Sequence, residues 1–338
     1  MKRSNSPTIK AKAVGLFGIL AVLIWILAQS APNPNWVKPY PRAGFGLSTS
    51  TDAENWAHQL GADWYLDWSV GSRYPVQFPE FWQMVRLSPN FVIKPDPEKI
   101  RSLARGYPGS VWIIGNEPDN IWQDNLTPEE YAHTYHQLYT LIKAADPSAK
   151  IAVGGVSQGT PLRLEYLNRV LKEYQSAFNQ KLPVDWWTLH GYVLREERGS
   201  WGVDIPPGLS ENQGKLYEVS DHGSLVLFEE QIKAFRSWMK VHGYQSVPLA
   251  LTEFGILMPA AYGYSPEMIS QYLKDTFSWL DTAVDTGTGY PADQFHLVQR
   301  WAWFSLADKT FPTSDLLDVK TGRLTQIGQA YRSYTRNK

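Results

Sequence analysis

The chain has 338 residues, of which 43% are hydrophobic, and a formal net charge of −1. This length is enough for one large domain or two ordinary ones, and the near-neutral charge gives no reason to expect a nucleic-acid partner or an anionic membrane surface. Cysteine is absent, which excludes disulfides and thiolate metal sites but does not fix the compartment.

Aromatic residues are abundant, with fifteen tryptophans and eighteen tyrosines. Large aromatic side chains fill cores, and flat rings also line the grooves of many sugar-binding proteins. Composition alone leaves both interpretations open.

The first forty residues have the layout of an export signal. Four basic residues precede an uncharged apolar run at 13–28, and a polar, proline-rich stretch follows it. The run is slightly longer than the ~7–15 residues of a signal core and shorter than the ~20 of a comfortable membrane span. Residues 1–40 are therefore expected to be a cleaved signal or a membrane anchor with a linker. Either places the remainder outside the cytoplasm, in the extracellular space or cell envelope.

Residues 41–338 are expected to form a single domain in which short apolar runs alternate with amphipathic segments. Several of these runs are almost continuously apolar, as in strands covered on both faces. The expected strands lie near residues 43–49, 62–70, 81–88, 110–117, 150–157, 184–193, 248–255 and 296–306.

Helical patterns fill most of the intervals between these strands. Thr127 is a suitable N-cap, and Glu130 three residues later completes a capping box. The expected helices lie within residues 95–107, 127–147, 161–180, 225–243, 265–284 and 322–337.

Eight strands alternating with helices predict a parallel sheet with helical crossovers, and eight strands close a (β/α)8 TIM barrel. The competing fold is an open, doubly wound sheet, which usually carries a glycine-rich phosphate loop after its first strand. No such loop follows residues 43–49, so the barrel is favoured. Active sites of such barrels lie at the C-terminal ends of the strands.

Two strands of the predicted barrel end in glutamate. Glu117 follows the fourth strand and Glu253 the seventh, which lie across the mouth from one another. Two facing carboxyl groups about 5–5.5 Å apart suit glycoside hydrolysis with retention. The alternative is that each glutamate forms an ion pair, with Arg86 or Arg300 as partner. Pro118 is expected to keep the chain extended at Glu117.

The motifs at these strand ends resemble those of clan A retaining glycoside hydrolases, the (β/α)8 superfamily that includes cellulases, mannanases, β-xylosidases and β-galactosidases. The resemblance rests on "GNEP" after strand four, "LHGY" after strand six and "TEFG" after strand seven. It implies that Glu117 is the acid/base, Glu253 the nucleophile and Asn116 a donor to the sugar 2-hydroxyl. It also implies that His190 lines the site and that Tyr192 hydrogen-bonds the nucleophile.

Two further points concern the eighth and second strands. "WAWF" on strand eight resembles the clan's platform tryptophan, with Trp303 as first choice and Trp301 behind it. Many clan members support the nucleophile with an arginine on an early strand, whereas strand two here ends in Asp67 and Trp68. These two residues are expected either to contact sugar in an outer subsite or to pack at the rim. Arg86 is a possible substitute for the missing arginine.

Residues 194–224 form a long insertion after strand six, and they include Trp201 and Tyr217. Loops of this length in compact domains are often functional, so we expect the insertion to form one wall of the substrate groove. His133 and His136 are separated by one helical turn without a third ligand, which indicates a solvated helix face. No metal and no cofactor are expected.

The sequence thus predicts a retaining glycosidase that cleaves a poly- or oligosaccharide, with β linkage expected, by double displacement with two glutamates. Its partner is a carbohydrate, a monomer is expected, and residues 13–28 are a possible membrane tether. The alternatives are a non-catalytic glycan-binding protein on the same fold, or a transglycosylase that shares the covalent step.

Overall fold

A computed structural model describes residues 42–48, 52–73 and 78–336 of the chain. The chain divides into two compact units, Met1–Tyr40 and Pro41–Lys338, and the expected signal or anchor segment lies outside the described residues. Among the described residues, no helix is both long and apolar enough to cross a membrane.

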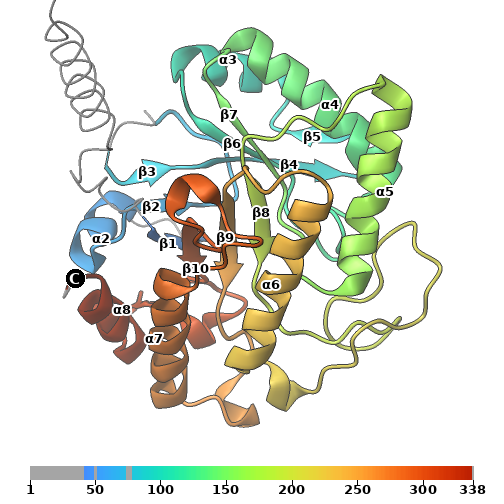
Figure 1. Ribbon diagram of the computed structural model, residues 1–338. Coiled ribbons are helices and arrows are strands. Elements are labelled where there is room, and N and C mark those ends of the chain that lie inside the picture. Colours follow the sequence, from blue (N-terminus) through green and yellow to red (C-terminus); the bar gives the residue numbers. More distant parts are fainter. Residues whose placement is uncertain (1–41, 49–51, 74–77, 337–338) are drawn as a thin grey trace, which may run out of the picture. The chain divides into compact units, whose positions relative to one another are not determined.

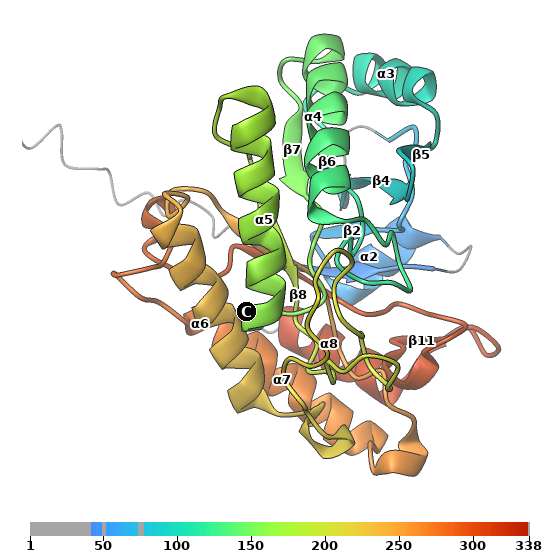
Figure 2. The same ribbon diagram turned by 90° about the vertical axis from the view of Figure 1, so that its right-hand side faces the viewer.

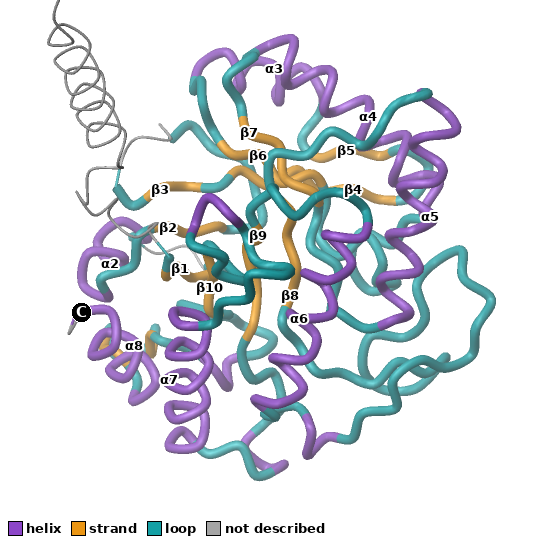
Figure 3. The backbone as a smooth tube through the Cα atoms, in the orientation of Figure 1, coloured by secondary structure: helices purple, strands orange, loops and turns teal. Residues whose placement is uncertain are grey.

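In the described residues, eight parallel strand positions form the centre of the second unit. Figures 1 and 3 show how they are grouped. Only Trp82 separates β3 from β4, so these two strands are successive parts of the third position. In ring order the strands are β1 (Ala43–Gly46), β2 (Trp64–Leu66), β3 (Glu80–Phe81) with β4 (Gln83–Ser88), β6 (Val111–Ile114), β7 (Lys150–Val153), β8 (Trp187–His190), β9 (Leu249–Phe254) and β10 (Arg300–Trp303).

The hydrogen-bonding order closes these strands into a barrel. β1 pairs with both β2 and β10, β2 pairs with β3, and β4 continues through β6 to β7. β8 pairs with β9 and β9 with β10. The remaining join, between β7 and β8, is made by parallel bridges from Ala152 to Trp186 and from Val156 to Leu189. The predicted (β/α)8 fold is confirmed.

Seven helices of the described residues surround the barrel (Figures 1 and 2). Thr127 and Glu130 form the expected capping box at the start of the helix after β6. The first helix was not predicted, and no helix separates β2 from β3 in the described part of that connection. The helices are α2 (Ala53–Leu60), α3 (Pro97–Gly106), α4 (Pro128–Ala145), α5 (Pro161–Phe178), α6 (Leu225–Val241), α7 (Pro266–Thr282) and α8 (Gln326–Arg336).

Several short elements outside the barrel strands and main helices were not predicted from the sequence. β5 (Val92–Lys94) folds back antiparallel on β4, and β11 (Leu317–Asp318) pairs antiparallel with β12 (Arg323–Leu324). Short 3-10 turns occupy Val219–Asp221, Ala260–Tyr262, Pro291–Asp293 and Pro312–Ser314.

Two apolar layers form the core, as expected when both faces of a parallel sheet are covered. Trp187, Trp301 and Trp303 belong to the large layer that packs around the strands and helices. The smaller cluster fills the barrel interior and comprises Trp64, Leu66, Trp82, Met84, Val111, Ile113, Ala152, Trp186, Ala250 and Ala302. Much of the aromatic content is therefore structural, and it packs the barrel tightly enough to hold the strand ends in fixed positions.

Candidate active site

Glu117 lies in a tight turn that leaves the end of β6. Its backbone φ is +43°, so the expected extended conformation is wrong. The turn is fixed by the Glu117 amide, which donates to the Gly155 carbonyl, and by the Asn120 amide, which donates to the Glu117 carbonyl. The buried carboxylate accepts hydrogen bonds from His190 Nδ1 at 2.8 Å and from Asn120 Nδ2 at 2.7 Å.

A buried aspartate that the sequence did not reveal holds this turn against the neighbouring strand. Asp124 Oδ2 accepts from the backbone amides of Asn116 at 2.7 Å and Leu87 at 3.0 Å. Its Oδ1 accepts from Arg86 Nε at 2.8 Å. Arg86 thus pairs with Asp124 in the structure, which contradicts its suggested role as support for the nucleophile and excludes it as the ion-pair partner of a strand-end glutamate.

Glu253 is held by two neutral donors at the end of β9. Trp68 Nε1 donates to Oε1 at 2.5 Å, and the Tyr192 hydroxyl donates to Oε2 at 3.2 Å. The Tyr192 contact is the one that the resemblance implied. Trp68, expected at an outer subsite or in rim packing, instead donates directly to the proposed nucleophile. Arg300 pairs with Glu80 at 2.6 Å and is not a partner of either strand-end glutamate.

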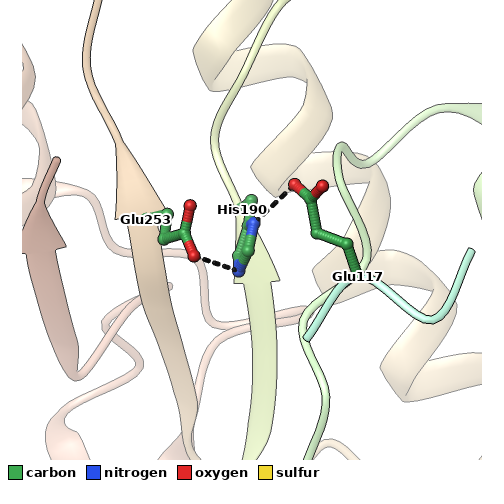
Figure 4. Close-up of side chains that lie close together, drawn as sticks. All are labelled: Glu117, His190 and Glu253. Atoms are coloured by element: carbon green, nitrogen blue, oxygen red, sulfur yellow. Dashed lines mark hydrogen bonds and ion pairs between the residues drawn. The ribbon is translucent and has the colours of Figure 1, made fainter. Parts of the chain in front are cut away.

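His190 lies between the two glutamates (Figure 4). Its ring is wholly buried, with Nδ1 at 2.8 Å from Glu117 and Nε2 at 3.6 Å from Glu253 Oε1. One carboxylate oxygen of each glutamate and a ring nitrogen of His190 lie within 4.8 Å of one another. Such a set is also a conceivable cation site, but here the imidazole is hydrogen-bonded to Glu117 and satisfies the charge itself.

The three groups shift one another's proton affinity. Burial alone would raise the pKa of Glu117, but the hydrogen bond and charge of His190, together with Asn120, outweigh burial and hold that pKa below its ordinary value. Burial raises the pKa of Glu253, the charge of Glu117 adds to this, and His190 opposes it. Burial lowers the pKa of His190, yet the two carboxylates overcome burial and raise it. Both shifts favour an imidazolium beside an ionised Glu117.

A polar cavity of about 330 Å³ opens beside Glu253, whereas Glu117 and His190 are not among its lining residues. The predicted residues Asn116, Asp67, Trp68 and Glu253 all line it, and Asn116 Oδ1 has no hydrogen-bond partner in the described part of the chain. Its full lining is Ser48, Asp67, Trp68, Arg86, Asn116, Gln123, Glu253, Phe304, Asp308, Thr310 and Phe311. Charged and amide side chains around a carboxylate are the groups that bind sugar hydroxyls.

The two tryptophans predicted on strand eight lie outside this cavity. Trp303 is wholly buried against Phe254, with ring centroids 5.4 Å apart, and its indole nitrogen donates to the Ser314 carbonyl at 2.9 Å. Trp301 packs on the same side of the strand, so both expectations of a platform are wrong. Side chains alternate along a strand, and Phe304, one residue later, lines the cavity instead.

One wholly buried guanidinium connects the turn of Glu117 to the insertion at 194–224. Arg163, on α5, forms ion pairs with Asp119 at 3.2 Å and with Glu196 at 3.0 Å. Its Nη2 also donates to the backbone carbonyls of Val203 at 3.1 Å and Asp204 at 2.6 Å. The insertion is thereby docked on the barrel, and its Leu194 and Val203 pack against Tyr192 and Phe304 at the site.

Comparison with known proteins agrees with this fold. Residues 221–331 match the family model described as glycosyl hydrolase catalytic core. A comparison with curated protein sequences gives no match.

Similar solved structures include three β-1,3-glucanases of the family GH128. The endo-β-1,3-glucanase from Pseudomonas viridiflava is 20% identical, with a TM-score of 0.58 over 87% of this chain and 98% of that one. The Amycolatopsis mediterranei endo-β-1,3-glucanase, solved with laminarihexaose, is 17% identical, with a TM-score of 0.58 over 87% and 99%. The curdlan-specific exo-β-1,3-glucanase from Blastomyces gilchristii, solved with glucose, is 19% identical, with a TM-score of 0.56 over 88% and 100%. The prediction of a (β/α)8 glycoside hydrolase fold is confirmed. The match to the family model supports the prediction that the protein is a glycosidase.

Replacement of Arg163 by methionine should destabilise the protein strongly. The change leaves Asp119 and Glu196 buried without a cation, for which we expect a loss of about 3–5 kcal/mol in the free energy of unfolding. Arg101→Met is the matched control, because Arg101 lies on α3 in an exposed pair with Glu98 and should contribute at most ~1 kcal/mol. Chemical denaturation measures both. Equal losses for the two variants would show that the buried network contributes no more than a surface pair.

Proposed function

We propose that the protein is a retaining glycoside hydrolase acting on β-linked glucan, with Glu117 as general acid/base and Glu253 as nucleophile. The observation that carries the proposal is the approach of two buried carboxylates, whose oxygens lie within 4.8 Å of one another and of which Glu253 lines a polar cavity. Retaining enzymes have carboxyl groups ~5–5.5 Å apart, whereas inverting enzymes leave about 6.5–9.5 Å for a water. The glucan substrate is suggested by the β-1,3-glucanase neighbours.

The first half of the reaction forms a covalent glycosyl-enzyme. Glu253 attacks the anomeric carbon while the bond to the leaving oxygen breaks, and that oxygen takes a proton from Glu117. In the second half Glu117 removes a proton from water, the water oxygen attacks the anomeric carbon, and the Glu253 carboxylate is released. Two inversions give net retention.

The resting proton distribution requires one further step before attack. Glu117 is ionised beside a protonated His190, but an acid must carry a proton. Transfer of the Nδ1 proton along the 2.8 Å hydrogen bond converts this pair into neutral imidazole and protonated Glu117. No proton is added from solvent, and Glu253 must be ionised to attack. His190 thus acts as the proton store of the acid.

The same pair of glutamates would also serve a transglycosylase. A transglycosylase would use the same covalent intermediate with a sugar acceptor in place of water, and product analysis separates the two reactions.

We also propose that the protein is exported to the cell envelope or beyond, because the basic flank and the apolar run at 13–28 resemble a signal or anchor.

Removal of the two carboxylates should have different kinetic consequences. Glu253→Ala should lower turnover of a β-glucan by roughly 10⁴-fold or more, because no covalent intermediate forms. Glu117→Ala should lose about 10²–10⁴-fold, most with poor leaving groups, and azide should partly rescue it because azide needs no general base. Glu98→Ala, at an exposed glutamate on α3, is the control. Full activity in Glu253→Ala would eliminate the mechanism.

The dependence of kcat/KM on pH should be bell-shaped. Glu253 must be ionised, so activity is lost as pH falls through its pKa, which lies above the ordinary glutamate value. The Glu117–His190 pair must keep one proton, so activity is lost as pH rises through the pKa of the pair, which lies above that of ordinary histidine. A full pH–rate profile tests this, and an acidic limb at or below the ordinary glutamate value would contradict it.

Replacement of Trp68 by phenylalanine should weaken Glu253 as a nucleophile. The change deletes the 2.5 Å donor to the ionised carboxylate while keeping a ring against Phe304. A hydrogen bond to a charged group contributes ~1.5–3 kcal/mol, so kcat/KM on the acidic side of the profile should fall about 10- to 100-fold, because more of Glu253 is protonated there. The acidic limb should move to higher pH, because the donor lowers the pKa of Glu253. Trp122→Phe, at an exposed indole, should leave that limb in place; an unmoved limb in Trp68→Phe would refute the assignment.

A further inference from the structure

A second cavity lies next to the catalytic one, and we call it the apolar cavity. It encloses about 660 Å³, within the ~300–1,000 Å³ range of ligand-binding pockets, and it shares Thr310 and Phe311 with the catalytic cavity as lining residues. Met258, another lining residue, packs against the small cluster that contains Tyr192, a donor to the proposed nucleophile. A ligand in the catalytic cavity can therefore extend into the apolar cavity.

The two cavities differ in the chemistry of their side chains. The catalytic cavity is lined by charged and amide groups, whereas none of the described residues around the apolar cavity has a charged or amide side chain. Among these residues, side-chain hydroxyls are supplied only by Tyr262, Thr310 and Thr313. A buried sugar hydroxyl needs a hydrogen-bond partner, and the loss of water without one is unfavourable. The apolar cavity is therefore suited to hydrocarbon rather than to a further sugar unit.

Several apolar side chains of this lining remain accessible to solvent. Tyr262 is 63% exposed and Phe311 43% exposed, while Trp201 and Met258 are half-buried. Exposed apolar surface beside an active site indicates contact with a ligand. A hydrocarbon group in the cavity would remove this surface from water, which is favourable in proportion to the area covered.

The loops around the apolar cavity are tied to one another by buried hydrogen bonds. His222, at the end of the insertion, donates from Nδ1 to the Val193 carbonyl at 3.0 Å and accepts at Nε2 from the Leu257 amide at 2.9 Å. Ser314, in the loop after β10, accepts from the Ile256 amide at 2.8 Å and donates to the Ile256 carbonyl at 2.7 Å. The loops after β8, β9 and β10 are thus connected, and walls that are already ordered reduce the entropy cost of binding.

We infer that the apolar cavity binds a hydrocarbon aglycone, so that the substrates include amphiphilic β-glycosides in which a long-chain alcohol is attached to the anomeric carbon. This inference rests on the proposed glycosidase function and names the leaving group. With the sugar in the catalytic cavity, Glu253 bonds to the anomeric carbon as the bond to the aglycone oxygen breaks. That oxygen takes a proton from Glu117 and leaves as the alcohol, and water then releases the sugar from Glu253.

The kinetic test compares octyl and butyl β-glucosides below the concentration at which octyl glucoside forms micelles. Both release a primary alcohol, so a difference in kcat/KM reports binding of the chain rather than departure of the leaving group. We expect kcat/KM to be at least tenfold higher for octyl glucoside. Full burial of the four additional methylenes at ~0.8 kcal/mol each sets an upper limit of roughly 200-fold. Equal values for the two glucosides would overturn the inference.

Variants of the lining show whether the preference for the longer chain arises in this cavity. Met258→Gln keeps the length of the side chain but makes it polar, and Tyr262→Ala removes a largely exposed ring. Each should lower kcat/KM at least fivefold more for octyl glucoside than for butyl glucoside. Met268→Gln is the matched control, because it makes the same change at a 47% exposed methionine on α7, outside the lining. Retention of the full octyl preference in both lining variants would contradict the inference.

A binding test separates this inference from the proposed function, and it decides the outcome if the alkyl glucosides are turned over too slowly to measure. In the Glu253→Ala protein, calorimetry should show at least tenfold higher affinity for octyl than for butyl β-glucoside. Adding Met258→Gln should weaken octyl glucoside at least fivefold more than laminaritriose. Equal losses for these two ligands would assign the cavity to sugar and overturn the inference.

The two hypotheses fail in different ways. Glucan turnover that depends on Glu253, without a preference for the octyl chain in kinetics or binding, would refute the hydrocarbon site and keep the glycosidase. Met258-dependent binding of octyl glucoside by a wild-type protein that turns over neither glucan nor alkyl glucosides would refute the glycosidase and keep the hydrocarbon site.

Discussion

The placement of two carboxylates within 4.8 Å of one another in a buried site is the constraint on which the rest of the site depends. Two adjacent negative charges away from water repel one another strongly, and burial penalises each of them separately. His190 relieves this by placing a proton and a positive charge between them. Its ring is wholly buried and its two nitrogens face different glutamates, so the imidazole is the electrostatic centre of the site.

Other buried carboxylates near the site have arginine as their cation. Asp124 pairs with Arg86, and Asp119 and Glu196 pair with Arg163. A guanidinium does not give up its proton in proteins, so the cation of these pairs is permanent and suits a structural role. Imidazole titrates near neutral pH and carries its proton on either nitrogen. The partners therefore distinguish structural carboxylates from the proposed catalytic ones. The structural carboxylates pair with arginine, which keeps its positive charge. The proposed acid/base pairs with a histidine, which can give its proton away.

The sequence predicts the barrel and the two glutamates because both depend on local pattern. Apolar runs between helical patterns predict where the strands lie. A glutamate directly after such a run can be recognised without knowing how the strands pair. Trp303 was misplaced because strands covered on both faces lack the polar–apolar alternation that would distinguish Trp303 from Phe304. The donor role of Trp68 and the pairing of Arg86 with Asp124 were missed for another reason. Each contact joins residues distant in sequence, and its partner is decided by how the loops fold over the barrel mouth.

The two glutamates have different partners, and each partner suits a different proposed task. Glu253, the proposed nucleophile, has neutral donors, and Glu117, the proposed acid/base, has a titratable one. In the proposed double displacement Glu253 becomes an ester and then a carboxylate again. A permanent cation beside it would favour the free carboxylate and oppose attack, whereas Trp68 and Tyr192 orient it at lower electrostatic cost. Glu117 must be an acid in one half-reaction and a base in the next. Without a partner, burial would hold it neutral, and beside an arginine it would stay ionised. A histidine at 2.8 Å permits both states within one catalytic cycle.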